Sequence, residues 1–502
     1  MYRDSVHYLP LHEKITDAAT AAGHIRNGTN LFISGFTGGY PKMVPRELAR
    51  RAREGERFKI NLYAGASTGE LVDRVLAEAG VVNWRRPYMS DRTMRTMINR
   101  GEILFKDDHL SSLAAQVRAG NWGPVHVAVV EAVAITEKGH LIPTMAVGNT
   151  PTYLREADKI IIEMSGAEPP ELEGIHDIYI PEDPPYRMPI PIYRASDRIG
   201  KPFIELNPAK VVAIIFSDEK DSPPTFNEPD EVALLIAEQI LDFVQHEIRK
   251  DRLPPGMPWQ SGVGDVANAV LGGFMEDDFF HNLELYSEVL QDSVLDLIDL
   301  GKVRAGSGSA LTLSEKYRTR FFNELYRYKE KIVLRPVEIS NSPEVIRRLG
   351  VLAINTAVEI DIYGHVNSTH VMGSQLMNGI GGSGDFERNG TLTFMVSPST
   401  AKNHQISCIV PMATHVDHSE HSVGIIVTEQ GLVDTRPLAP RQVAEAIIKR
   451  CSHPEYRDML WDYYQRAVRE RGGHEPHLLG EAFAMHERFL RTGDMRPGRG
   501  KS

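Results

Sequence analysis

In the first half of the chain, short apolar runs alternate with stretches in which apolar residues recur every three or four positions. The runs have the length and the Val/Ile content of buried strands, and the intervening stretches have the period of amphipathic helices. Strands are predicted at residues 30–34, 60–67, 125–130, 159–163 and 211–216, and helices around 45–51 and 70–77. This β-α-β rhythm predicts an α/β fold with a parallel sheet.

Proline-rich and polar segments divide the chain further. Residues 181–191 are predicted to form a loop that wraps the first domain, and residues 217–230 are predicted to form a linker before a helix at 231–249. A chain of 502 residues exceeds the size at which one hydrophobic core keeps growing. We therefore expect two domains, at 1–220 and 221–490, and a frayed tail at 491–502.

Two segments of the chain resemble each other. Residues 132–141 and 357–366 share the pattern Ala-Val-x-Ile-x-x-x-Gly-His-apolar, at an offset of 225 residues. This offset is the length of a domain and is too long for a solenoid repeat. It favours a duplicated domain, although two similar strand-turn segments could also arise by coincidence.

Composition and charge exclude some classes of function. A net charge of −11 and a pI near 6.0 argue against nucleic acid or an anionic membrane as the main partner. The chain has two cysteines, too few for a disulfide framework. No apolar signal region begins the chain, and no run approaches the roughly 18 apolar residues of a spanning helix. We expect a soluble cytoplasmic protein, without nucleic acid or membrane as partners.

Glycines cluster in the segment Met377–Phe386, which holds four of them within six residues. A backbone without Cβ atoms can approach a ligand closely, although glycines also serve ordinary tight turns. Further motifs surround this segment in the sequence, namely Gln260–Val270, Leu285–Val289, Ser340–Pro343, Gly364–Thr369, Ser397–Lys402 and Thr428–Gly431.

In their order along the chain, these motifs resemble the acetyl-CoA hydrolase/transferase family of class I CoA-transferases. The resemblance is densest from about Pro258 to Arg436 and strongest to the succinyl-CoA:acetate CoA-transferases. It implies two related open α/β domains with the active site at their interface. A homodimer is also expected.

Glu288 is the predicted nucleophile, because the resemblance places the family's catalytic glutamate there. A carboxylate is ionised at pH 7 and can attack a thioester carbonyl without a separate base. Ser287 has the character of an N-cap, and residues 289–300 have a helical pattern that Gly301 would end. Glu288 would then lie in the first turn of a helix, where a glutamate also commonly serves only to complement the helix dipole.

The attack creates an oxyanion, which requires backbone N–H donors. Two glycine-bearing loops, one with Gly264 and one with Gly382, offer such donors. Asp265 has the character of an N-cap for a helix that follows the first of these loops. The resemblance favours the Gly382 amide and an amide near Val263 or Gly264. It also implies that Asn341 orients the glutamate and that Glu429 lies near the site. The residues expected to contact coenzyme A are Val263, Gly264, Asp265, Val266, Ala267, Asn378, Gly382 and Lys402.

A histidine-rich segment offers an alternative chemistry. His415, Asp417, His418 and His421 have side chains that bind transition metals. The segment follows a strand-like run, and the expected reaction needs no Lewis acid, so a hydrogen-bonded turn is preferred. We expect no metal and no tightly bound cofactor, with coenzyme A as a substrate.

The resemblance implies CoA transfer between short carboxylic acids, with succinyl-CoA and acetate as the first choice, through a glutamyl-CoA thioester. Two alternatives within the family are an acetyl-CoA hydrolase and a propionyl-CoA:succinate CoA-transferase. A third is a non-catalytic ligand sensor on the same kind of α/β domain. The chain lacks a basic helix-turn-helix segment, which argues against the sensor.

Overall fold

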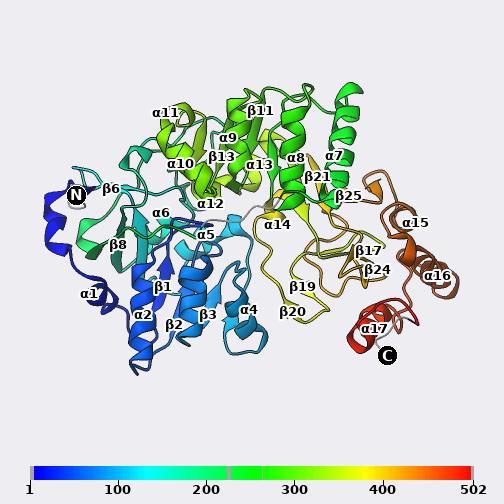
Figure 1. Ribbon diagram of the computed structural model, residues 1–502, viewed down its shortest axis with the longest axis horizontal. Coiled ribbons are helices and arrows are strands. Elements are labelled where there is room, and N and C mark those ends of the chain that lie inside the picture. The colour runs from blue at the N-terminus through cyan, green and yellow to red at the C-terminus, as the bar shows by residue number, and fades with distance from the viewer. Residues whose placement is uncertain (1–4, 223–227, 263, 499–502) are drawn as a thin grey trace. The chain divides into compact units, whose positions relative to one another are not determined.

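The computed structural model describes residues 5–222, 228–262 and 264–498, which form two compact units (Figure 1). Unit 1 contains Met1–Thr225 and His281–Leu349, and unit 2 contains Phe226–Phe280 and Gly350–Ser502. The units differ from the continuous segments 1–220 and 221–490 suggested above, because residues 281–349 pack with the first unit. Among the described residues, no helix combines the length and the apolar character needed to cross a bilayer.

The main sheet of unit 1 confirms the predicted parallel arrangement. Its strand order is β4-β3-β2-β1-β5-β8-β9, and every neighbouring pair is parallel. The strands are β1 Asn30–Ile33, β2 Ile60–Tyr63, β3 Val82–Arg86, β4 Leu104–Phe105, β5 Val127–Ala132, β8 Lys159–Ser165 and β9 Val211–Ser217. The helices are α1 Ala18–Ala22, α2 Met43–Arg53, α3 Val75–Glu78 after a π-helical turn Glu70–Arg74, α4 Arg92–Asn99, α5 Leu113–Arg118 and α6 Thr150–Glu156.

Strand β8 shows why the apolar runs fold in this way. Ile160, Ile161 and Ile162 follow one another, and none of the three is exposed to solvent. Successive side chains of a strand point to opposite faces, so both faces of the sheet are covered at this strand. The Pro-rich segment 181–191 contains neither helix nor strand, as predicted.

The strand order of this sheet reverses between β1 and β5. The chain runs outward from β1 to β4 and then returns to the other side of β1 for β5, β8 and β9. In open α/β sheets, ligands bind beyond the carboxyl ends of the strands at such a reversal. The segment Gly35–Gly39 follows β1 at this point and makes a tight turn, with the Phe36 N–H donating to the Gly38 carbonyl at 3.0 Å.

Unit 1 also contains a smaller set of parallel strands from residues 281–349, in the order β15-β13-β11. These are β11 Leu283–Tyr286, β13 Val303–Gly308 and β15 Ile332–Leu334. A short parallel pair, β12 Val289–Leu290 with β14 Ala310–Leu311, extends beside them. The helices here are α9 Asp292–Asp299, α10 Glu315–Asn323, α11 Leu325–Tyr328, α12 Val337–Ser340 and α13 Pro343–Leu349.

Unit 2 contains strands in the order β10-β16-β21-β25-β26, of which the last alone runs antiparallel to its neighbour. They are β10 Trp259–Ser261, β16 Leu352–Thr356, β21 Leu392–Val396, β25 Ile425–Thr428 and β26 Gly431–Asp434. Short strands form hairpins: β19 His370–Val371 with β20 Gln375–Leu376, and β22 Thr400–Ala401 with β23 Ile406–Ser407. The helices are α7 Glu231–Arg249, α8 Asp265–Glu276, α14 Ser383–Asn389, α15 Pro440–Arg450, α16 Pro454–Glu470 and α17 Ala484–Thr492.

The two similar sequence segments form the same hairpin, one in each unit. In unit 1, β6 Ala134–Ile135 pairs with β7 Leu141–Ile142, and in unit 2, β17 Glu359–Asp361 pairs with β18 Val366–Asn367. The partners Ala134 and Ile142 become Glu359 and Asn367 when 225 is added to each number. A register that repeats residue for residue supports the duplication.

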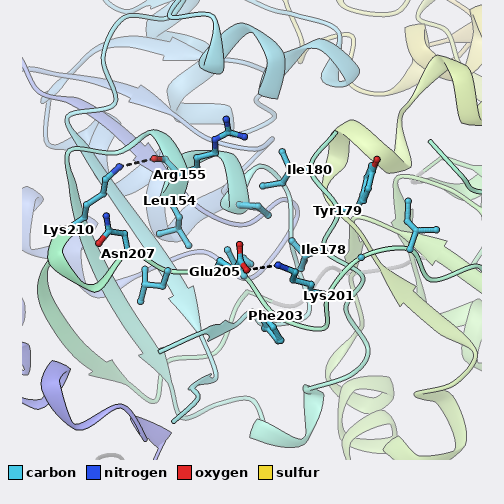
Figure 2. Close-up of a pocket in the computed structure, with 15 residues that line it drawn as sticks. Leu154, Arg155, Ile178, Tyr179, Ile180, Lys201, Phe203, Glu205, Asn207 and Lys210 are labelled. Carbon is cyan, nitrogen blue, oxygen red and sulfur yellow. Dashed lines mark hydrogen bonds and ion pairs between the residues drawn. The ribbon is translucent and has the colours of Figure 1, made fainter. Parts of the chain in front are cut away.

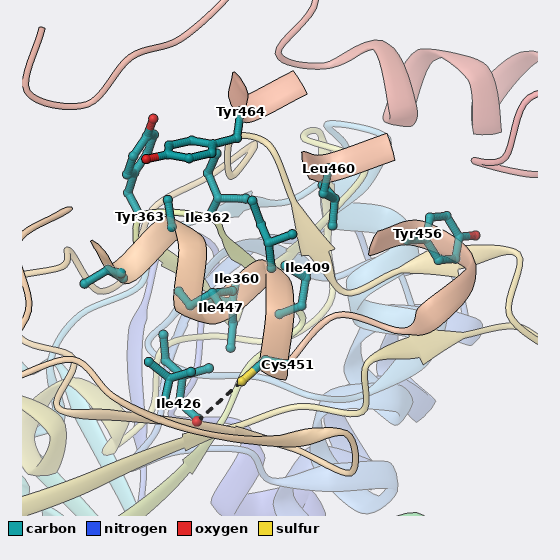
Figure 3. Close-up of a cluster of buried hydrophobic side chains, with 14 of the residues drawn as sticks. Ile360, Ile362, Tyr363, Ile409, Ile426, Ile447, Cys451, Tyr456, Leu460 and Tyr464 are labelled. Carbon is teal, nitrogen blue, oxygen red and sulfur yellow. Dashed lines mark hydrogen bonds between the residues drawn. The ribbon is translucent and has the colours of Figure 1, made fainter. Parts of the chain in front are cut away.

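A hydrophobic core of unit 2 includes the buried side chains of α15 and α16 (Figure 3). Ile447 of α15 and Cys451, the residue directly after this helix, pack with Ile360 of β17 and Ile426 of β25. Burial raises the pKa of the Cys451 thiol to about 12, so this cysteine acts as a small apolar side chain.

The expectation of a frayed tail is wrong for residues 491–496. Helix α17 continues to Thr492, and Met495 is fully buried in the same core. The Met495 N–H donates to the Gln405 carbonyl at 2.9 Å. An apolar side chain near the end of a chain stays fixed when a core receives it.

Candidate functional site

Glu288 lies in unit 1, in the turn between β11 and β12, and its side chain is half-buried. Its carbonyl oxygen accepts hydrogen bonds from the Ser309 N–H at 2.8 Å and the Ala310 N–H at 3.3 Å. These two bonds fix the main chain of Glu288 against the end of β13 and the start of β14.

The predicted position of Glu288 in the first turn of a helix is wrong. Val289 and Leu290 pair with Ala310 and Leu311 as a strand, and helix α9 begins only at Asp292. Pairing with distant residues has overridden the local helical pattern, as tertiary contacts often do. The helix dipole therefore does not explain the choice of a glutamate here.

Asn341 faces this glutamate within unit 1. It is fully buried at the end of α12, and its Nδ2 donates to Glu288 Oε2 at 2.9 Å. The Ser340 hydroxyl donates to Asn341 Oδ1 at 3.0 Å, and the Asn341 N–H donates to the Val337 carbonyl at 2.9 Å. With Oδ1 accepting one bond, Nδ2 is directed at the carboxylate. The structure thus brings Glu288 and Asn341 together.

Tyr286 joins the two segments that carry these residues, and the sequence reasoning missed it. Its ring is fully buried, and its hydroxyl donates to the Ile339 carbonyl in α12. Tyr286 precedes Glu288 by two residues, and Ile339 precedes Asn341 by two. The only available signal was the position of this tyrosine inside the Leu285–Val289 motif.

The turn with Glu288 also connects to the strand reversal of the main sheet. Gly148 donates its N–H to Ser309 Oγ at 3.2 Å, and Ser309 N–H bonds the Glu288 carbonyl. Gly148 has a φ of +54°. A Cβ on this residue would lie 2.5 Å from the carbonyl oxygen of Gly35, where the turn after β1 begins. Only a glycine at position 148 allows this close approach. Through Gly148 and Ser309, the candidate nucleophile Glu288 is therefore connected to the strand reversal, the point at which open α/β sheets bind ligands.

In unit 2, the glycine-rich segment Met377–Phe386 forms a tight turn that leads into α14. Gly381 has φ of +58°, and Gly382 is the N-cap residue of the helix. The Ser383 hydroxyl donates to the Ile380 carbonyl at 2.6 Å and closes the turn. Asn378 Oδ1 is buried, and no described residue donates a hydrogen bond to it.

The other glycine loop of unit 2 precedes α8. Gly264 is the N-cap of this helix with φ of +146°, so Asp265 is the first helical residue, and the prediction of Asp265 as N-cap is wrong by one position. Val266 and Ala267 follow in the first turn. Val263 lies outside the described residues.

Glu429 binds Ser399, which lies three residues before Lys402 in unit 2. Glu429 accepts from the Ser399 N–H at 2.8 Å, from the Ser399 hydroxyl, and from Gln430 Nε2 at 3.1 Å. Burial alone would raise the pKa of Glu429, but these hydrogen bonds lower it below its usual value. Lys402 is exposed at the tip of the β22–β23 hairpin, with φ of +49°. Glu429 therefore holds the segment that leads to Lys402.

The histidine-rich segment does not converge on a single point. His415 Nε2 lies 3.2 Å from Asp417, and His421 Nδ1 lies 2.6 Å from Glu420. His418 is buried and faces Ser383 instead. Over the described part of the chain, no group of three or more His, Cys, Asp or Glu side chains is arranged to hold a metal ion.

A cavity of about 750 Å³ opens elsewhere in unit 1 (Figure 2). It lies between α6 and the segments around Ile178 and Phe203, and it is lined by none of the predicted site residues. Lys201 is paired with Glu205, and Lys210 donates to the Arg155 carbonyl at 2.8 Å.

Comparison with known proteins identifies the family. The model of the acetyl-CoA hydrolase/transferase N-terminal domain matches residues 2–216, and that of the C-terminal domain matches residues 318–464. The chain belongs to the acetyl-CoA hydrolase/transferase family. It is an enzyme of this family, which confirms the predicted resemblance and makes a non-catalytic sensor untenable.

The relatives include transferases and hydrolases. The chain is 48% identical to the succinyl-CoA:acetate CoA-transferase of Clostridium kluyveri, over 97% of the chain and 91% of the relative. It is 43% identical to the propanoyl-CoA:succinate CoA transferase of Escherichia coli (95% and 98%). It is 42% identical to an acetyl-CoA hydrolase of Schizosaccharomyces pombe (96% of each).

A solved structure supports the fold. The 4-hydroxybutyrate CoA-transferase of Porphyromonas gingivalis matches 91% of this chain and 99% of its own, with a TM-score of 0.63 and 19% identity. At this level of identity the likeness concerns the fold alone. It confirms the predicted α/β architecture of the CoA-transferase type.

Proposed function

We propose that the enzyme transfers CoA between short carboxylic acids, with succinyl-CoA and acetate as the preferred pair, and that Glu288 is the nucleophile. The observation that carries this proposal is the hydrogen bond from Asn341 Nδ2 to Glu288 Oε2 at 2.9 Å. A buried, doubly fixed amide holds the carboxylate in one orientation, which favours attack on a bound carbonyl. The similarity to the Clostridium kluyveri enzyme supports the choice of substrates.

The proposed reaction proceeds in four steps. The Glu288 carboxylate attacks the acyl-CoA carbonyl, the C–S bond breaks, and a mixed anhydride and CoA thiolate form. The thiolate attacks the glutamyl carbonyl and releases the donor carboxylate, which leaves a glutamyl-CoA thioester. The acceptor carboxylate attacks this thioester and again displaces the thiolate. The thiolate then attacks the acceptor's acyl carbonyl, so acyl-CoA leaves and Glu288 is restored.

Residues of unit 2 would bind the substrate. We assign the oxyanion to the Gly382 amide and to an amide near Gly264, and CoA to the other residues expected above. Asn378 supports this assignment, because a buried amide oxygen without a donor is costly unless a ligand supplies one. Lys402 can meet a phosphate at the exposed tip of its hairpin.

A covalent intermediate tests the proposal. Incubation with succinyl-CoA alone should leave CoA attached to the peptide that contains Glu288, and mass spectrometry of a digest detects it. Glu288→Gln should form no adduct and show no transfer, while its unfolding temperature stays within a few degrees of the wild type. An adduct on any other residue would contradict the assignment of the nucleophile.

Hydrolysis of acetyl-CoA is the second candidate, because relatives at 42% identity are acetyl-CoA hydrolases. In that reaction, water attacks the glutamyl thioester in place of an acceptor carboxylate. If transfer dominates, the release of succinate and the formation of acetyl-CoA should depend on acetate. Double-reciprocal plots of rate against succinyl-CoA concentration, measured at several acetate concentrations, should then give parallel lines. Release of free CoA at a rate independent of acetate would establish the hydrolase instead.

We further propose that the enzyme is a cytoplasmic homodimer. A chain of 56.1 kDa predicts a dimer of roughly twice that mass. Light scattering during gel filtration measures the mass directly, and a mass near that of one chain would contradict the dimer.

A further inference from the structure

His418, considered above as a metal ligand, is fixed within unit 2 by both its main chain and its side chain. Its carbonyl accepts from the Val366 N–H at 2.8 Å, and its own N–H donates to the Val366 carbonyl at 3.1 Å. Its side chain is buried, with Nε2 at 3.3 Å from Ser383 Oγ. The imidazole therefore reaches from the hairpin β17–β18 to the glycine-rich turn.

The direction of this hydrogen bond follows from the serine. Ser383 Oγ has one hydrogen, which it donates to the Ile380 carbonyl at 2.6 Å. Towards His418, Ser383 Oγ can only accept, so the imidazole carries its hydrogen on Nε2. The result is a relay of two donors that runs from His418 through Ser383 to Ile380.

This relay braces the turn that presents the Gly382 amide. Gly381 is in the left-handed region and has no side chain to restrict it, so its peptide planes need support from outside the turn. Within the turn, the Ser383 N–H donates to the Ile380 carbonyl at 3.3 Å, the same distance that separates His418 Nε2 from Ser383 Oγ, whereas the Ser383 hydroxyl donates to this carbonyl at 2.6 Å. The Ser383 hydroxyl, held by His418, is the stronger of the two contacts with Ile380.

We propose that His418 is a positioning residue for the oxyanion donor at Gly382, acting through the hydroxyl of Ser383. This inference rests on the proposed function, because it takes the Gly382 amide as a donor. Removal of a whole oxyanion donor slows an enzyme by about 10²–10³-fold, so a misaligned donor is expected to cost about tenfold or more. The function of His418 requires the Nε2–H only, which both the neutral and the protonated imidazole offer.

Three variants test the proposal through the rate at which CoA becomes attached to Glu288 in a single turnover. His418→Leu removes the donor and should slow this step about tenfold or more. His418→Gln keeps an amide N–H near the position of Nε2 and should restore the rate to within about threefold of the wild type. Ser383→Ala removes the hydroxyl and should match His418→Leu, and the double variant should be no slower than either alone.

Two controls separate positioning from other roles. His421→Leu, on an exposed histidine of the same segment, should leave the rate unchanged. The pH profile of His418→Gln should keep the shape of the wild type, whereas a proton-transferring histidine would lose one limb of the profile. If His418→Leu does not fold, His418→Ala takes its place, because Ser383→Ala also removes the bond to the Ile380 carbonyl and so cannot isolate the contribution of His418.

The outcomes are distinct. A rate for His418→Leu or Ser383→Ala within twofold of the wild type would overturn the inference, and so would losses that multiply in the double variant. A wild-type enzyme that acquires no CoA on Glu288 would instead overturn the proposed function, and this inference with it.

Discussion

Substitution of Lys42 by methionine should destabilise unit 1 severely. Lys42 is buried at the start of α2 and pairs with Glu131 and, at 2.9 Å, with Asp221. Glu163 and Glu168 are buried nearby, and burial raises the pKa of both, that of Glu168 to about 7. One lysine thus compensates several carboxylates that have little access to water.

The magnitude follows from the burial of the pair. Burial disfavours the charged lysine, but the attraction of Glu131 and Asp221 outweighs this effect and raises the pKa of Lys42. Removal of one partner from a buried pair costs about 3–5 kcal/mol, because the other charge remains without compensation. For a unit of this size, each kcal/mol lowers the melting temperature by about 2 °C, so the expected loss is about 6–10 °C.

Scanning calorimetry at pH 8 and pH 5 provides the assay. Without Lys42, Glu131 must be buried charged or take up a proton, and protonation is easier at low pH, so the loss should be larger at pH 8. Lys201→Met is the matched control, because Lys201 is exposed in the same unit and pairs with Glu205; it should shift the transition by about 1 °C or less. Equal shifts for the two variants would refute the reasoning.

Two further predictions concern unit 2. His365 Nδ1 donates a hydrogen bond to Asp361 at 3.1 Å, and this bond, helped by the charge of Glu420, raises the pKa of His365 to about 9. The stabilisation is present below pH 6.5 and lost as the pH rises through 9, so His365→Gln should flatten the fall in melting temperature between these values. Burial raises the pKa of Cys408 and Cys451 to about 12, so a thiol reagent should modify neither in the folded enzyme and both after denaturation, and rapid reaction of the native protein would contradict their burial.

The strands and the long helix were predictable because their signals are local. Ile160, Ile161 and Ile162 follow one another in β8, and Asp230 caps α7 by accepting the Ala233 N–H at 2.8 Å. Both signals act within a few residues. They determine where an element begins and what kind of element it is, whatever packs against it.

The surroundings of Glu288 were not predictable in this way. Its carbonyl oxygen accepts hydrogen bonds from the Ser309 and Ala310 N–H groups. No periodic pattern of apolar residues along the chain predicts these contacts. The membership of residues 281–349 in unit 1 depends on still more distant pairs, such as the buried ion pair between Arg118 and Glu338 at 2.9 Å, which lie 220 residues apart. The family resemblance indicated Glu288 as the candidate nucleophile, but the contacts that hold this residue come from the three-dimensional structure alone.

The two hairpins of matching register carry different chemistry on the same backbone in the two units. Thr136 Oγ1 accepts the His140 N–H at 3.1 Å in unit 1, and Asp361 Oδ1 accepts the His365 N–H at 3.0 Å in unit 2. The backbone contact is the same, but only an aspartate can also hold a charged imidazole. The exchange of a hydroxyl for a carboxylate therefore leaves the turn intact and, in unit 2, adds a charged side chain at this position that pairs with the imidazole of His365.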